Sequence, residues 1–153
     1  MLPSPRSFPM LAAALFIAAC HGTKPTAFSH QVSLAEPEQA PGLLWINGNG
    51  EGNSRDKAVH DAQRAIFEQL LFRGIAGSSW SRPMVPDEAN SKLEHPDLYK
   101  ALLDDLGYRP FILAAQHGTL DKKTGTLTTK LHIDTNALRK HLEQHGIIRP
   151  FGL

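Results

Sequence analysis

Two histidines, His141 and His145, are the residues of this chain whose type and spacing best suit metal chemistry. They lie four positions apart in a segment expected to be helical, so both rings project from one face and can reach one ion. A third ligand would have to come from His117, His132 or His60, and no glutamate follows His141 as it does in the zinc-protease motif. We therefore expect neutral histidines half-buried against a sheet, and keep metal binding or pH sensing as the alternative.

Other residues that often do chemistry occur here without the rest of their motifs. The glycine-rich run Gly48–Gly52 lies between an expected strand and an expected helix, where phosphate-binding loops occur. No Gly-Lys-Ser or Gly-Lys-Thr follows it, and Glu51 places a negative charge where a phosphate would lie. Asp104 and Asp105 are adjacent, so on a helix their side chains point about 100° apart and form no dyad. The sequence therefore predicts a tight turn at the glycines and no enzymatic activity.

The single cysteine, Cys20, is the position at which we expect a covalent modification. It follows the apolar run Leu11–Ala19, and Arg6 lies in the short segment before that run. A cationic start, an apolar stretch of about 7–15 residues and small residues at the cut are typical of a secretory signal peptide. The run is shorter than the roughly 20 apolar residues that cross a bilayer. These features predict export of the chain.

The residues Ile17-Ala-Ala19 before Cys20 also resemble the lipobox of bacterial lipoproteins. This resemblance implies that residues 1–19 are a lipoprotein signal peptide and that Cys20 is acylated and becomes the mature N-terminus. Lipoproteins of this kind generally carry three acyl chains, and each buried methylene contributes about 0.8 kcal/mol, so the anchor is stable. The next residue, His21, is not acidic, which implies the outer membrane of a Gram-negative cell and a domain facing the periplasm. The alternatives are an ordinary secreted protein with a free thiol and a cytosolic chain.

Length and charge restrict the remaining classes. The 153-residue chain keeps 134 residues without residues 1–19, which suits one domain of about 100 residues after a tether. The loss of Arg6 leaves 15 basic residues against 15 acidic ones, so no basic surplus exists to attract the phosphates of a nucleic acid. Residues 20–41 contain three prolines and no periodicity, and we predict a flexible tether there. Residues 42–153 are then expected to form a single α+β domain.

Periodicity and turn residues predict the order strand, helix, strand, short helix, two-stranded hairpin, helix. The expected strands are Leu43–Ile46, a weak one at Ile75–Ser81, and two hairpin strands at Phe111–His117 and Thr126–Ile133. The expected helices run from an N-cap at Asn53 or Ser54 to Arg73, from Pro96 to Gly107, and from Thr135 to Gly146. The proline-rich stretch 82–107 is interpreted as an excursion from the main fold. The expected architecture is a two-layer α+β fold, with helices on one face of a mainly antiparallel sheet of three to four strands.

The opening Trp45-Ile-Asn-Gly-Asn-Gly50, followed by the alanine-punctuated helix Ala58–Leu70, is similar to that of two related groups. They are the twenty-kilodalton outer-membrane lipoproteins and the N-terminal domain of flagellar assembly protein T. The resemblance covers about residues 43–147. It implies a lipidated or periplasmic protein without enzymatic activity, and several members build rings or disks around the flagellar basal body. The stretch 82–107 has no counterpart in that pattern, and Cys20 is the functional residue that transfers.

Together these observations predict a lipid-anchored, non-enzymatic assembly or scaffold protein at the bacterial outer membrane, in a flagellar or another envelope role. Its expected partners are the membrane, through the lipid on Cys20, and a periplasmic protein or a second copy. The predicted protein contact uses the sheet edge near Ile75–Ser81 or the stretch 82–107. The alternative function is a periplasmic module that binds a metal or small ligand through His141 and His145. No cofactor and no nucleic-acid partner are expected.

Overall fold

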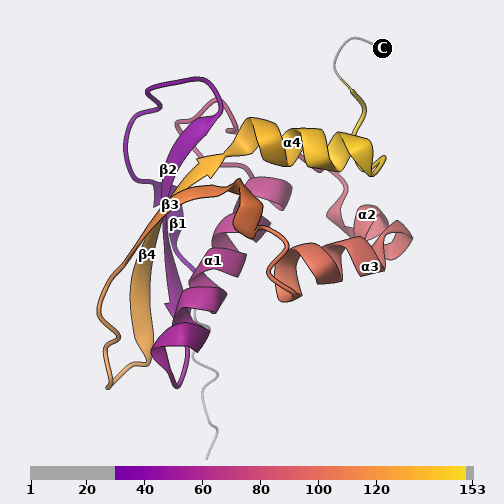
Figure 1. Ribbon diagram of the computed structural model, residues 1–153. Helices are drawn as coiled ribbons and strands as arrows, with labels where there is room; N and C mark the ends of the chain where they lie inside the picture. The colour runs from indigo at the N-terminus through magenta and orange to yellow at the C-terminus, as the bar shows by residue number, and fades with distance from the viewer. Residues whose placement is uncertain (1–29, 151–153) are drawn as a thin grey trace, which may run out of the picture.

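A four-stranded antiparallel sheet forms one layer of the molecule and the helices form the other (Figure 1). The computed structural model describes residues 30–150. In spatial order the strands are β1 (Val32–Leu34), β2 (Leu43–Glu51), β4 (Thr126–Asp134) and β3 (Ile112–His117). The α+β class predicted from the sequence is confirmed.

The helical layer is built around one long helix, α1 (Arg55–Phe72), which packs on β2 and β4. The shorter helical segments are α2 (Glu88–Glu94), α3 (Pro96–Tyr99), the π-helical turn η1 (Lys100–Asp104), the 3-10 turn η2 (Arg109–Phe111) and α4 (Thr135–Gln144). The start of α1 is as predicted, because the hydroxyl of Ser54 accepts a hydrogen bond from the N–H of Lys57. The prediction of the last helix is also confirmed, and the carboxylate of Asp134 caps it by accepting from the N–H of Ala137.

The predicted turn at Gly48–Gly52 is wrong, because β2 continues through the glycines to Glu51. Gly48 and Gly50 lie on the face of β2 that meets α1. A Cβ atom on Gly50 would lie 2.2 Å from the carbonyl oxygen of Ala58 and 2.3 Å from the nitrogen of Ala62. The glycines therefore let the strand and helix backbones approach closely. They are needed here because they have no Cβ atom, not because the chain turns.

The predicted tether also ends too late. Val32–Leu34, inside the predicted range 20–41, form β1, and Leu34 is in register with Ile46 of β2. The folded domain therefore includes residues well before position 42. The predicted signal peptide, Cys20 and residues 20–29 of the predicted tether lie outside the described residues.

The segment Ile75–Ser81, predicted as a weak strand, is a compact loop instead. The N–H of Ile75 donates to the carbonyl of Trp80, and the hydroxyl of Ser78 donates to the carbonyl of Ile75. These bonds close the loop on itself, so it pairs with no strand. The predicted sheet edge at these residues therefore does not exist.

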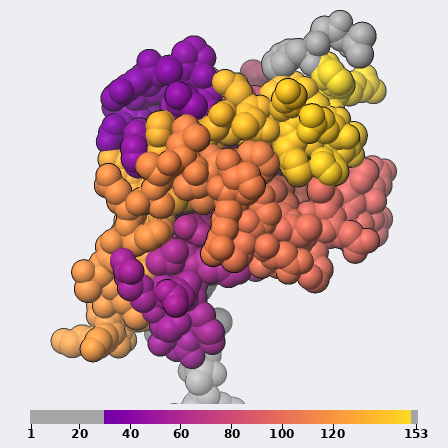
Figure 2. All heavy atoms as spheres, viewed as in Figure 1, coloured from indigo at the N-terminus to yellow at the C-terminus, as the bar shows by residue number. Residues whose placement is uncertain are grey.

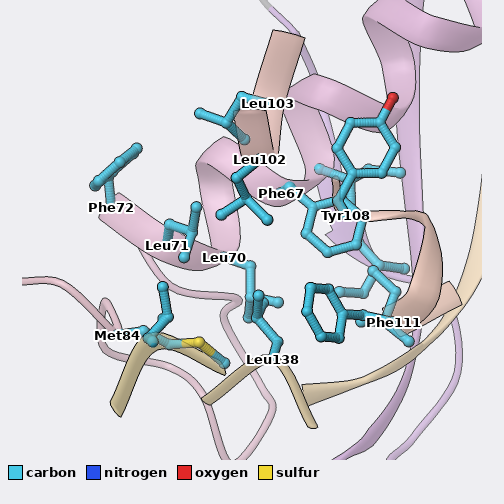
Figure 3. Close-up of a cluster of buried hydrophobic side chains, with 14 of the residues drawn as sticks. Phe67, Leu70, Leu71, Phe72, Met84, Leu102, Leu103, Tyr108, Phe111 and Leu138 are labelled. Atoms are coloured by element: carbon cyan, nitrogen blue, oxygen red, sulfur yellow. The ribbon is translucent and has the colours of Figure 1, made fainter. Parts of the chain in front are cut away.

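The stretch 82–107 is part of the core rather than an excursion from it, and it contains α2, a helix not expected from the sequence. Five of its apolar side chains are buried: Met84, Val85, Tyr99, Leu102 and Leu103. Figure 3 shows members of this set packed with side chains of α1 and with Leu138 of α4. The prolines break regular structure, but the residues between them close the core on the side away from the sheet.

Candidate functional site

The free edge of β3 is the best candidate for a protein contact surface. β3 pairs with β4, and the described residues place no strand on its other side. Leu113, Ala114, Ala115 and Gln116 are exposed, and Leu113 keeps 53% of its surface accessible. In Figure 2 the orange segment that contains β3 lies uncovered on the face turned toward the viewer. A sheet edge of this kind offers its backbone to another strand.

Backbone hydrogen-bonding groups point out from this edge. The N–H of Gly118 donates to the carbonyl of Thr128 at 2.8 Å, which fixes the direction of the ladder at the end of β3. Successive residues of an antiparallel pair alternate between facing the partner strand and facing away. The groups of Gln116 therefore face β4, whereas the N–H and C=O of Ala115 and His117 face outward.

The edge also lacks the charges that normally prevent edge-to-edge pairing. Between Ile112 and His117 there is no lysine, arginine, acidic residue or proline. Burial, reinforced by the positive charge of Arg55, lowers the pKa of His117, so this ring favours its neutral form at neutral pH. A bulge between Ile112 and Ala114 is the irregularity in the β3–β4 register. β1, at the opposite edge, is only three residues long.

The two histidines of the predicted metal pair do lie together at the end of α4. The ring centroids of His141 and His145 are 4.3 Å apart, and His141 also contacts the ring of Phe111. Burial, reinforced by His145, lowers the pKa of His141. His145 itself is exposed, and its Nδ1 atom hydrogen-bonds with the carbonyl oxygen of His141 at 2.9 Å. The expected half-buried position is thus confirmed for His141 and is wrong for His145.

The proposed third ligands lie elsewhere. His60 lies beside Tyr108, His117 hydrogen-bonds with Thr129, and His132 stacks on Trp45. Across residues 30–150, no three His, Cys, Asp or Glu side chains come together in an arrangement that could hold a metal ion. The metal alternative therefore has two neighbouring histidines and no third ligand from the described part of the chain.

The outer face of the sheet carries a stacked pair of rings that the sequence does not predict. The rings of Trp45 and His132 are nearly parallel, with centroids 4.6 Å apart, and the Nζ atom of Lys130 lies 4.8 Å from the Trp45 ring centroid. Lys130 also pairs with Glu36. A hollow of about 140 Å³ lies beside this stack. The strand register of β2 and β4 brings these side chains together, and local sequence patterns do not contain that register.

None of the helices formed by residues 30–150 has the length and apolar character needed to cross a membrane.

Comparison of the chain with models of known protein families, with curated proteins and with solved structures gave no match. The resemblance to the twenty-kilodalton lipoproteins and to flagellar assembly protein T stays a prediction, as does acylation of Cys20.

Proposed function

We propose that this protein is a lipid-anchored, non-enzymatic scaffold of the bacterial envelope that assembles with a second copy of itself. The anchor is the acylated Cys20 at the outer membrane, and the contact is the free edge of β3. The exposed and uncharged edge of β3 is the observation that supports self-assembly, which we call the assembly half of the proposal. The residues Ile17-Ala-Ala19 before Cys20 support the lipid anchor, which we call the anchoring half.

A second copy suits this edge better than a charged partner does. Antiparallel pairing of β3 with β3 of another copy joins two four-stranded sheets into one continuous sheet about a twofold axis. The pairing satisfies the outward N–H and C=O groups of Ala115 and His117 in both copies. Because the residues from Ile112 to Gln116 carry no charge, the twofold pairing opposes no like charges. The exposed side chain of Leu113 loses contact with water in the same step.

The first prediction concerns the anchor. Cells that express the full-length protein with radiolabelled palmitate should incorporate the label, and Cys20→Ser should abolish it and release the protein from the membrane fraction. The reason is that Cys20 supplies the only thiol in the chain that can be acylated. An unlabelled wild-type protein, or a Cys20→Ser variant that stays at the membrane, contradicts the anchoring half of the proposal.

The second prediction concerns assembly of the full chain carrying Cys20→Ser, measured by size exclusion with light scattering. We expect a dimer that Leu113→Lys and Ala115→Pro each convert to a monomer. The lysine adds a repelling charge to the edge, and the proline removes an outward N–H without touching the bonds to β4.

The matched control for Leu113→Lys is Leu93→Lys on α2. Leu93 is the other exposed large apolar side chain of the described residues, with 80% of its surface accessible, and it is remote from β3 in sequence and element. This variant should remain a dimer. A wild-type chain that stays monomeric at all concentrations, or a dimer that survives both β3 variants, overturns the assembly half. A stable complex with a different envelope protein through β3 would also replace the second copy as the partner.

A further inference from the structure

A cleft of about 320 Å³ lies between the N-terminal half of α1 and the segment that runs from the end of η1 to the start of η2. Its polar lining comes from Asp56, His60 and Gln63 on α1 and from Asp104 and Arg109 on the facing segment. Small-molecule sites have volumes of roughly 300–1,000 Å³, and one water takes about 30 Å³, so the space suits a ligand of on the order of ten heavy atoms.

His60 lines this cleft and carries a buried polar atom without a partner. Its Nε2 is buried and has no hydrogen-bond partner, a condition that no other buried side-chain nitrogen or oxygen of residues 30–150 shares. The ring is held beside Tyr108, with centroids 6.3 Å apart and planes 22° apart. Buried polar groups nearly always have a partner, so this nitrogen is an exception among the described residues, and a ligand in the cleft meets the ring of His60 rather than this atom.

The wall behind the cleft is fixed by Tyr108 and Gln63. The ring of Tyr108 lies in the apolar cluster, and Figure 3 shows its hydroxyl pointing away from the other labelled side chains. That hydroxyl donates to the Oε1 atom of Gln63 at 3.3 Å. Burial raises the pKa of Tyr108 to about 12, so the hydroxyl remains a donor at any physiological pH. Gln63 is thereby held in one orientation.

The charges at the cleft are of both signs. Arg109 is exposed and forms no ion pair or side-chain hydrogen bond with the described residues, and the same holds for the carboxylate of Asp56. Asp104 is already paired with Arg64 at 3.5 Å. A simple anion would meet two carboxylates here and a simple cation would meet Arg109. A molecule that carries both charges a few ångströms apart can satisfy both sides.

Leu106 supplies an apolar wall in an unusual backbone conformation. Its φ of 64° is the one positive value among the described residues that are not glycine. The N–H of Gly107 donates to the carbonyl of Ala101 at the end of the helical turn, and glycine is the usual residue in a left-handed conformation just after a helix. Strained residues of this kind cluster at binding sites. A leucine here adds to the cleft a side chain that glycine would not.

We propose that this cleft binds a small zwitterion, a free amino acid or a dipeptide, with its carboxylate on Arg109, its ammonium group on Asp56 and the ring of His60 beside it. This inference does not depend on lipid anchoring or on the β3 edge. The apolar side chain of the ligand would lie against Leu106 and Val59.

The experiment follows the imidazole resonances of the full-length protein by NMR during titration with each of the twenty L-amino acids and with Ala-Ala. We expect at least one of these probes to shift the His60 resonance with a Kd below about 1 mM. Asp56→Asn removes the anion, and Arg109→Gln removes the cation. Each should weaken binding at least about tenfold, the equivalent of 1.4 kcal/mol.

The matched control is Arg82→Gln, since Arg82 is exposed and does not line the cleft; its affinity should equal that of the wild type. Acetate and methylammonium, which each carry one charge, should bind more weakly than the zwitterion. The proposal is overturned if no probe moves the His60 resonance at about 10 mM, a concentration well above the expected Kd. It is equally overturned if both cleft variants bind as the wild type does, or if acetate binds as tightly as the best amino acid.

Discussion

His141 illustrates how one side chain couples the stability of this protein to pH. Desolvation of its ring, together with the neighbouring His145, lowers the pKa of His141 below its ordinary value of 6.5. The unfolded chain therefore binds this proton at a higher pH than the folded chain does. The contribution of the neutral ring to stability is present above pH 6.5. It is lost as the pH falls through the lower pKa that His141 has in the folded state.

The corresponding prediction is that the free energy of unfolding, measured by urea denaturation, decreases as the pH is lowered from about 7.5 through 6.5, the ordinary pKa of histidine. His141→Gln should reduce this slope, because the amide does not titrate. His145→Gln is the matched control and should have a smaller effect, since His145 is exposed. An unchanged slope in His141→Gln would contradict this assignment.

At the scale of elements, the contact between β2 and α1 depends on the absence of a side chain. The predicted outcome of Gly50→Ala is a loss of about 3 kcal/mol in the free energy of unfolding, because the new Cβ would clash with the backbone of Ala58 and Ala62. Asn49→Ala on the same strand removes one hydrogen bond from Thr128 and should cost less than about 1 kcal/mol. Equal losses in the two variants, measured by chemical denaturation, would show that the close approach carries little energy.

The elements that local patterns determine were predictable, and those that pairing determines were not. α1 and α4 have polar N-caps at Ser54 and Asp134, and the alternation in β4 is regular, so their bounds follow from the sequence. β2 was predicted too short because Asn47 and the glycines favour turns. Hydrogen bonding to β1 and β4 on both sides overrides that preference.

At the scale of the whole molecule, the candidate sites depend on strand order and on contacts distant in sequence. The pattern of β3 predicts a strand but does not reveal that it lies at the end of the sheet, so the contact edge was placed at Ile75–Ser81 instead. The cleft beside His60 forms only where α1 meets the segment from the end of η1 to the start of η2. The sequence could show His60 but not that its Nε2 atom would be buried without a partner.

If Cys20 is acylated as proposed, the early start of β1 would limit how far the folded part can lie from the membrane. Only twelve residue steps separate Cys20 from Val32, a path of at most about 43 Å whatever its conformation. A tether that continued to Pro41 would allow nearly twice that height. Acylated copies in one leaflet would then lie within a thin layer next to the membrane. The short tether would raise their effective concentration there. Under that confinement, the dimer expected in solution would be populated more fully at the membrane surface.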